Sequence, residues 1–222
     1  MENADTLSFM MHLPLDIRTA LSGILYEATF KSGTQIFTQG DLHTGFYFVV
    51  TGRVKIGFTG DDGHEVILCM PQPGETFCVA STLEGGPQLG TAYAITDVRL
   101  LCATSSEFNV LRKKYPQLLS LVQQYCFKEL RQIVKRLEAA TFLGVEARLA
   151  RVLLGKDFDE LTNFASIDKF NITHQELADL IGTSRETISR ILEIWGRKSW
   201  VVLDKRHIII KRRDELERQA LR

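Results

Sequence analysis

The stretch from Leu118 to Phe142 contains neither proline nor glycine, and this feature most restricts how the chain can fold. Apolar residues recur along it at spacings of three and four, which predicts one amphipathic α-helix. About 25 residues at 1.5 Å each give a helix roughly 37 Å long. The opposite face is charged, so we predict a seam between two copies of the chain, formed by Val122, Cys126, Leu130, Ile133 and Leu137. A core helix packed within its own domain is the alternative.

Residues 30–105 have the pattern of short β-strands. Apolar runs are separated by glycines at short intervals, and the GDDG sequence at 60–63 is typical of a hairpin. Two more strands are expected within 92–104, with a turn near Asp97. Many short strands at this spacing predict an antiparallel roll or barrel. Ser105 and Ser106 then predict the capped start of a short helix.

A pair of short helices hinged at a glycine is predicted after residue 172. Thr173 and Glu176 have the spacing of a capping box, and Gly182 supplies the backbone freedom that a sharp turn needs. Thr183 and Ser184 are both suitable N-caps for a second helix that ends near residue 195. Two helices joined by a turn of about three residues match the helix-turn-helix pattern, whose second helix enters the DNA major groove.

The second helix has one apolar and one polar face. The apolar face contains Ile188, Ile191, Leu192 and Trp195. Arginine can bind guanine and a carboxylate can accept from cytosine, so the other face is suited to reading base edges: Arg185, Glu186, Ser189 and Arg190. Glu186 has an alternative interpretation, as the N3 partner of Thr183 in a second capping box.

The charge distribution also indicates DNA. The whole chain has 27 Lys and Arg against 27 Asp and Glu, whereas residues 185–213 have nine against three. A locally basic stretch in a neutral chain predicts an anionic partner that touches one part only. A β-hairpin with a basic tip follows the helix pair. The predicted contacts to the DNA backbone are therefore Thr173, Thr183, Ser184, Lys205 and Arg206.

Composition excludes several other classes of protein. The four cysteines form no Cys-x-x-Cys pair, which argues against a disulfide framework and predicts a reduced, cytoplasmic setting. Apolar runs are too short to span a membrane, and the N-terminus lacks the features of a secretory signal. Since no catalytic or metal-ligand motif is evident, we expect that the chain is not an enzyme.

The sequence THQELADLIGTSRETISRILEIW, from Thr173 to Trp195, closely resembles the helix-turn-helix of the CRP/FNR transcription factors. The upstream sequences GTQIFTQGD, FYFVVTGRVKI, DDGHEVIL and PGETF resemble the cyclic-nucleotide-binding-type β-roll of that family. The resemblance implies an α+β chain with an effector-sensing β-roll at 1–115, a dimerisation helix at 116–143 and a winged helix-turn-helix at 144–222. It also implies a homodimer on a palindromic operator, with RNA polymerase as a partner. Arg185, Glu186 and Arg190 resemble the branch that reads TGTGA, whereas Ser189 resembles the branch that reads TTGAT.

The resemblance weakens at the effector pocket, which it assigns to Phe77, Cys78, Val79, Ala80, Gly90 and Thr91. Members that bind cAMP have a glutamate where this chain has Val79 and an arginine where it has Gly90. A buried phosphate without its cation costs roughly several kcal/mol, so we expect a signal other than cAMP. An FNR-type iron–sulfur cluster needs N-terminal cysteines, and residues 1–68 contain none.

Cys78 leaves three interpretations open. It stands where the CO-sensing branch has a haem-ligating cysteine, but Ala80 replaces the histidine of that branch. It could instead be a redox-sensing thiol or a buried apolar side chain. Our leading expectation is an apolar or small anionic effector between the roll and the long helix. The alternative to a DNA-binding regulator is a ligand-binding regulatory module that acts through a protein partner.

Overall fold

The computed structural model describes residues 10, 13–42, 45–71, 73–156, 172–204 and 207–221. The chain forms two compact units: Met1–Phe58 with Leu68–Glu129, and Thr59–Ile67 with Leu130–Arg222. The long helix is present as predicted, as α4 (Pro116–Phe142), and it contributes residues to both units. Among the described residues, no helix has both the length and the apolar character needed to cross a membrane.

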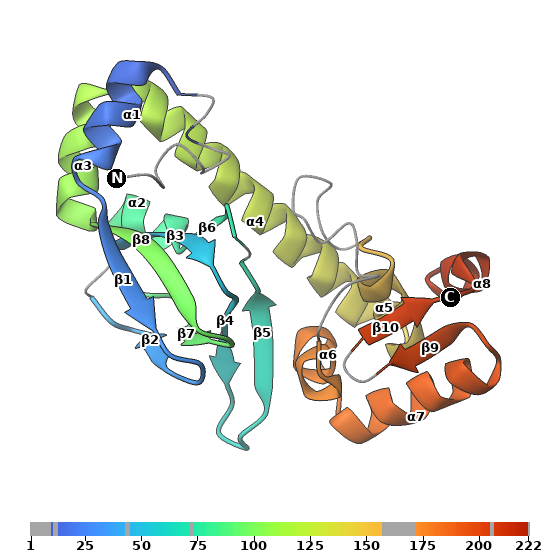
Figure 1. Ribbon diagram of the computed structural model, residues 1–222. Coiled ribbons are helices and arrows are strands. Elements are labelled where there is room, and N and C mark those ends of the chain that lie inside the picture. Colours follow the sequence, from blue (N-terminus) through green and yellow to red (C-terminus); the bar gives the residue numbers. More distant parts are fainter. Residues whose placement is uncertain are drawn as a thin grey trace. The chain divides into compact units, whose positions relative to one another are not determined.

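The predicted antiparallel roll is present, and most of it belongs to the first unit, while its residues 59–67 are grouped with the second (Figure 1). One sheet has the order β1 (Tyr26–Phe30), β8 (Val98–Thr104), β3 (Gly45–Thr51) and β6 (Thr76–Phe77). The other has the order β2 (Gln35–Phe37), β7 (Thr91–Ala94), β4 (Val54–Thr59) and β5 (Glu65–Cys69). The GDDG hairpin joins β4 to β5, with Gly63 in the left-handed region at φ 79°. Three short helices complete the unit: α1 (Leu15–Ser22), α2 (Val79–Glu84) and α3 (Ser105–Lys114).

Alternation along the strands builds the core of the roll. In β4, Val54 and Ile56 are buried and the intervening Lys55 is not, as the two-residue period of a strand requires. A second apolar cluster lies against the helices, where the rings of Phe46 and Phe108 stack with centroids 4.8 Å apart. Burial of these large side chains supplies most of the stabilisation of the unit.

The start of α3 differs from the prediction in its cap. The capping residue is Thr104, not Ser105 or Ser106: Thr104 Oγ1 accepts from the Glu107 backbone N–H at 3.2 Å, and the Glu107 carboxylate accepts from the Thr104 N–H. Both serines lie within the helix. Three adjacent hydroxyl residues are chemically equivalent as caps, so the sequence alone could not select among them.

The predicted seam on α4 is only partly available to a second protomer. Val122 is fully buried in the core of the first unit, and Cys126 packs against the same cluster. Val122 therefore does not belong to the seam, because its side chain is already covered within its own chain. Farther along the helix the apolar side chains are exposed, by 43 to 65%: Phe127, Leu130, Ile133, Val134 and Leu137.

Besides Thr59–Ile67, the second unit contains the end of α4 and six further elements (Figure 1). These are α5 (Val145–Leu153), α6 (His174–Ile181), α7 (Arg185–Arg197), β9 (Val201–Asp204) with β10 (His207–Ile210), and α8 (Arg213–Gln219). Leu149, Leu177 and Leu192 are fully buried at its centre. This core holds α6 and α7 together and leaves the polar face of α7 in solvent.

Candidate nucleic-acid interface and effector site

The start of α6 is fixed by its own sequence. Thr173 Oγ1 accepts from the Glu176 backbone N–H at 3.1 Å, and Glu176 Oε2 accepts from the Thr173 N–H at 2.6 Å. This reciprocal pair is the predicted capping box, and it satisfies donors that a helix start leaves open. The remaining N–H groups of the first turn and the Thr173 hydroxyl make this end of α6 suitable for a phosphate.

The turn between α6 and α7 depends on Gly182. Its φ of 70° and ψ of 60° lie in the left-handed region, as predicted for a glycine at a helix C-terminus. Two backbone groups close the turn, because both the Gly182 and Thr183 N–H groups donate to the Ala178 carbonyl. On the other side, Arg148 Nη2 of α5 donates to the Gly182 carbonyl at 3.5 Å. The turn thereby sets the direction in which α7 begins.

The cap of α7 decides between two predictions. Ser184 is the N-cap, and its hydroxyl accepts from the Thr187 backbone N–H at 3.2 Å. Thr183 lies outside the helix, so the N3 residue is Thr187 and the second capping box between Thr183 and Glu186 does not form. Glu186 is an exposed residue of the first turn. The helix also continues to Arg197, two residues beyond the predicted end.

The exposed face of α7 carries the predicted base-reading residues. Arg185, Glu186 and Arg190 are exposed, and Ser189 is half-buried. None of the three exposed side chains has an ion-pair partner within the described ranges. The two guanidinium groups are therefore free to bind guanine O6 and N7 without first breaking an internal pair.

The hairpin after α7 has the predicted form. Strands β9 and β10 are antiparallel, with Asp204 opposite His207. Lys205 and Arg206, the predicted backbone contacts, lie outside the residues that the structure describes. The base of the hairpin is held by the Trp200 carbonyl, which accepts from the Lys211 and Arg212 N–H groups at 2.8 and 3.1 Å.

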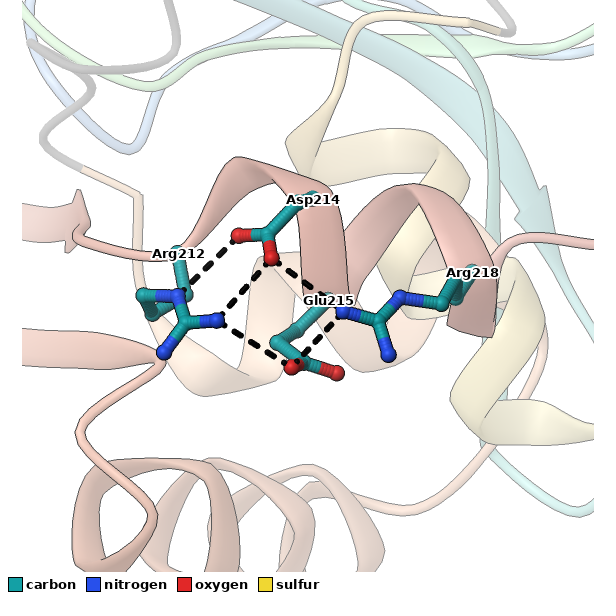
Figure 2. Close-up of polar contacts among 4 residues, drawn as sticks. All are labelled: Arg212, Asp214, Glu215 and Arg218. Carbon is teal, nitrogen blue, oxygen red and sulfur yellow. Dashed lines mark hydrogen bonds and ion pairs between the residues drawn. The ribbon is translucent and has the colours of Figure 1, made fainter.

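An ionic network at the start of α8 reduces the charge that the basic stretch presents. Figure 2 shows Arg212 and Arg218 on either side of Asp214 and Glu215. Arg212 Nη2 lies 3.0 Å from Asp214 Oδ2, and Arg218 Nη2 lies 2.9 Å from Glu215 Oε1. The hydrogen bond and charge of Arg212 lower the pKa of Asp214 to about 2, so the network stays ionised at neutral pH. Two cations thus face two anions, which leaves this end of α8 close to neutral.

Two of the predicted effector-pocket residues, Val79 and Gly90, have apolar or crowded surroundings. Val79 is fully buried in an apolar cluster at the start of α2. A Cβ added to Gly90 would lie 2.9 Å from the Gly57 carbonyl oxygen of β4, so an arginine could enter here only if the strand moved. Gly90 therefore differs from the arginine of cAMP-binding members in the space available as well as in charge.

The other predicted pocket residues have different surroundings. Phe77 is fully buried and stacks on Tyr47 with centroids 5.1 Å apart, so its role is in the core of the roll. Ala80 is half-buried in α2, and the Thr91 hydroxyl accepts from the Gln39 N–H. Cys78 has φ 61°, a left-handed conformation that costs a non-glycine residue about 1 kcal/mol. Burial raises the pKa of its thiol well above the usual value, which disfavours the reactive thiolate.

Sequence reasoning missed two polar groups in this unit. Burial, followed by the charge of Glu75, raises the pKa of Glu129 to about 8, and the Glu129 charge in turn contributes to the raised pKa of Cys78. Gln88 is 1% exposed, and in the described part of the chain neither atom of its amide has a hydrogen-bond partner. Its backbone is held by Gly40 and Asp41. Local sequence carries no signal for either feature, because both depend on which segments cover these side chains.

Comparison with known proteins covers both units. The family model for the cyclic nucleotide-binding domain matches residues 27–115, and that for the Crp-like helix-turn-helix domain matches residues 147–219. The cyclic AMP receptor protein of Thermus thermophilus is 32% identical over 190 residues, which are 86% of this chain and 85% of that protein. The CRP-like cAMP-activated global transcriptional regulator of Mycobacterium tuberculosis is 29% identical over 90% of this chain and 91% of its own length.

A solved structure supports the fold independently. The c-di-GMP-responsive global regulator CLP of Xanthomonas campestris matches with a TM-score of 0.75, covering 89% of this chain and 99% of that one, at 20% identity. At that identity the likeness concerns the fold alone. The relatives are transcriptional regulators, which confirms the expectation of a non-enzymatic function. The chain therefore belongs to the CRP/FNR family of transcriptional regulators.

Proposed function

We propose that this chain is a sequence-specific transcriptional regulator that reads a palindromic operator with α7. The observation that carries the proposal is the pair of exposed guanidinium groups of Arg185 and Arg190, which have no ion-pair partner among the described residues, on a helix that two caps and Gly182 hold in place. Glu186 and Ser189 complete the reading face. Thr173, Thr183 and Ser184 are at the helix starts, where they can contact phosphates together with Lys205 and Arg206 of the wing.

The proposed regulator acts as a homodimer. Leu130, Ile133 and Leu137 are 43 to 65% exposed on one helix, together with Phe127 and Val134. Large apolar side chains at helical spacing on an otherwise charged helix are best buried against a second copy. Two-fold symmetry would present two α7 helices to half-sites about one turn of DNA apart. In this proposal, residues 1–115 sense the effector, residues 116–143 form the dimerisation helix and residues 144–222 bind DNA.

The proposed signal is a small molecule other than cAMP that binds the first unit. Val79 and Gly90 supply neither a carboxylate for ribose nor a cation for phosphate, and the raised pKa of Glu129 shows surroundings that disfavour negative charge. Of the apolar and anionic effectors first considered, these groups favour an uncharged one. The Gln88 amide offers both a donor group, Nε2, and an acceptor atom, Oε1, to it. Haem ligation and redox sensing by Cys78 receive less support, because its pKa is raised.

The test of the proposed function is DNA selection by the purified full-length chain. Random duplexes are incubated with the protein in low salt, recovered and sequenced, and the best site is then titrated at several salt concentrations. We expect an enriched palindrome and an affinity that falls steeply as salt rises. No enrichment under any redox or ligand condition would instead favour a regulatory module that acts through a protein partner. Absorption spectra and the native mass of the purified protein reveal any retained haem or other effector.

The cellular context follows from the same proposal. A regulator that reads chromosomal DNA works in the cytoplasm, and RNA polymerase is its natural partner. A signal can shift the balance between two dimer arrangements only if it binds one of them more tightly. The expected consequence is a measurable change in DNA affinity when the effector is added.

A further inference from the structure

His174 and Ser189 form a hydrogen bond between the two helices of the helix-turn-helix. His174 opens α6, Ser189 lies in the second turn of α7, and Nδ1 of the imidazole is 2.8 Å from Oγ of the serine. Both side chains are half-buried. Ser189 is one of the predicted base-reading residues, whereas sequence analysis gave His174 no role. The bond therefore connects a residue of the first helix to the reading face of the second.

The direction of this hydrogen bond decides what Ser189 can still do. A serine hydroxyl has one proton to donate and lone pairs to accept with. If Nδ1 is the acceptor, the only O–H of Ser189 is committed to this bond, and the hydroxyl can act toward a base only as an acceptor. If Nδ1 carries the proton, the hydroxyl remains free to donate. Burial, followed by the charge of Arg185, lowers the pKa of His174, so the imidazole is neutral at neutral pH and has a single N–H.

The other ring nitrogen determines which nitrogen holds that N–H. Among the described residues, Nε2 of His174 has no hydrogen-bond partner. It belongs to the first residue of α6, at the helix end where open backbone N–H groups favour an anion. A DNA phosphate at this end would accept from Nε2–H, which leaves Nδ1 as a lone pair. The tautomer, and with it the Ser189 hydroxyl, would then be set by contact with the DNA backbone.

We propose that His174 is a positioning residue for base recognition. Its Nδ1 accepts the hydrogen bond that the Ser189 hydroxyl donates, so that Ser189 acts only as an acceptor toward the duplex. An acceptor prefers an amino group in the major groove, which adenine N6 and cytosine N4 supply. It is repelled by positions that offer only acceptors, such as guanine O6 and N7. This inference rests on the proposed function, since it assigns the base preference of a residue within the same reading face.

The test compares base preferences among matched variants of the full-length protein. Selected DNA sites are sequenced for the wild type, Ser189→Ala, His174→Ala and the double variant, with Gln175→Ala as a control on the neighbouring residue. Ser189→Ala should lose a preference for adenine or cytosine at one base pair. His174→Ala should weaken the same preference roughly three- to tenfold, as expected for one hydrogen bond, and the double variant should match Ser189→Ala. His174→Asn, which keeps an acceptor near the place of Nδ1, should restore most of the preference.

A second readout does not depend on any substitution. Correlation of the imidazole protons and nitrogens of His174 by NMR, in the complex with the selected duplex, should show an unprotonated Nδ1 and a protonated Nε2. A protonated Nδ1 would overturn the inference. So would base preferences that His174→Ala leaves unchanged while the variant remains folded. If the wild type binds no DNA, the proposed function is wrong as well. If it binds DNA specifically and His174→Ala keeps the same base preferences, only the inference is wrong.

Discussion

Gln219 Nε2 donates to Glu146 Oε2 at 2.8 Å, which joins the last helix, α8, to α5 across 73 residues of sequence. Gln219 is buried whereas Glu146 is exposed, so the bond is only partly shielded from water. Gln219→Ala should therefore lower the free energy of unfolding by about 1 kcal/mol, the usual contribution of a hydrogen bond to a charged group that is partly exposed. Urea unfolding followed by circular dichroism measures the change. Gln117→Ala, at an exposed position, is the control and should be close to neutral.

The turn of the helix-turn-helix should tolerate no side chain at Gly182. Its φ of 70° is strained for any L-residue, so Gly182→Ala should destabilise the protein by about 1 kcal/mol and weaken DNA binding by tilting α7. Gly144 is the matched control. It has φ −65° and no atom within 4 Å of an added Cβ, so Gly144→Ala should change neither property appreciably. Equal effects of the two substitutions would contradict the role of the left-handed turn.

Base reading by α7 can be tested by comparing an arginine in its second turn with one in its last turn. Arg190 is exposed and has no ion-pair partner in the part of the chain that the structure describes, whereas Arg197 is paired with Glu193 at 3.3 Å in the last turn. Arg190→Ala should lose roughly 1 to 3 kcal/mol of binding and relax specificity at one base pair. Arg197→Ala should retain the base preferences. Fluorescence anisotropy on single-base variants of the selected site separates these outcomes, and a loss by Arg190→Ala that is equal on all sequences would argue against a base contact.

The exposed apolar stripe of α4 predicts the assembly state. Leu130 and Ile133 are 55% and 43% exposed in the single chain. Placing a carboxylate there by Leu130→Glu or Ile133→Glu should break a seam between protomers, because an unpaired charge would be buried in it. Sedimentation velocity should show a dimer for the wild type and a monomer for each variant. Variants that remain monodisperse dimers would place the interface elsewhere.

Glu129 predicts a dependence of stability on pH. Its pKa is about 8 in the folded protein and about 4.5 when unfolded, so the folded state holds its proton more tightly. As pH rises from 4.5 to 8, the unfolded state gains more from ionisation, and the free energy of unfolding falls before it levels off. The side chain retains some exposed surface, so we discount the full shift and expect roughly 2 kcal/mol.

The matched variants for this prediction are Glu129→Gln and Glu138→Gln, both on α4. Glu129→Gln should remove most of the fall in stability between pH 5 and pH 8. Glu138 is exposed, and its substitution should preserve the pH dependence of the wild type. Urea unfolding at the two pH values measures both. A wild type whose stability does not fall over this range would contradict the burial of the Glu129 carboxyl group.

Much of this protein could be predicted because it is encoded locally. The spacing of apolar residues from Leu118 to Phe142 specifies a helix, and the pair Thr173 and Glu176 specifies where another begins. Gly182 adopts the left-handed conformation for which glycine is suited. Each of these signals relates residues that are at most a few positions apart, so the local sequence is sufficient to predict the element. The order of the roll, the long helix and the helix-turn-helix follows from such signals in sequence.

Choices among similar residues could not be made from the sequence alone, and burial and distance were decided by tertiary structure. Thr104 caps α3 in place of two serines, and Ser184 caps α7 in place of Thr183. Val122 fits the apolar stripe of α4 as well as Leu130 does, but only Val122 is covered by the first unit. The approach of Gly90 to Gly57, the burial of Glu129 and the bond from His174 to Ser189 likewise join distant segments. Periodicity and capping are properties of one segment, whereas burial and distance belong to two, and only the folded chain brings those two together.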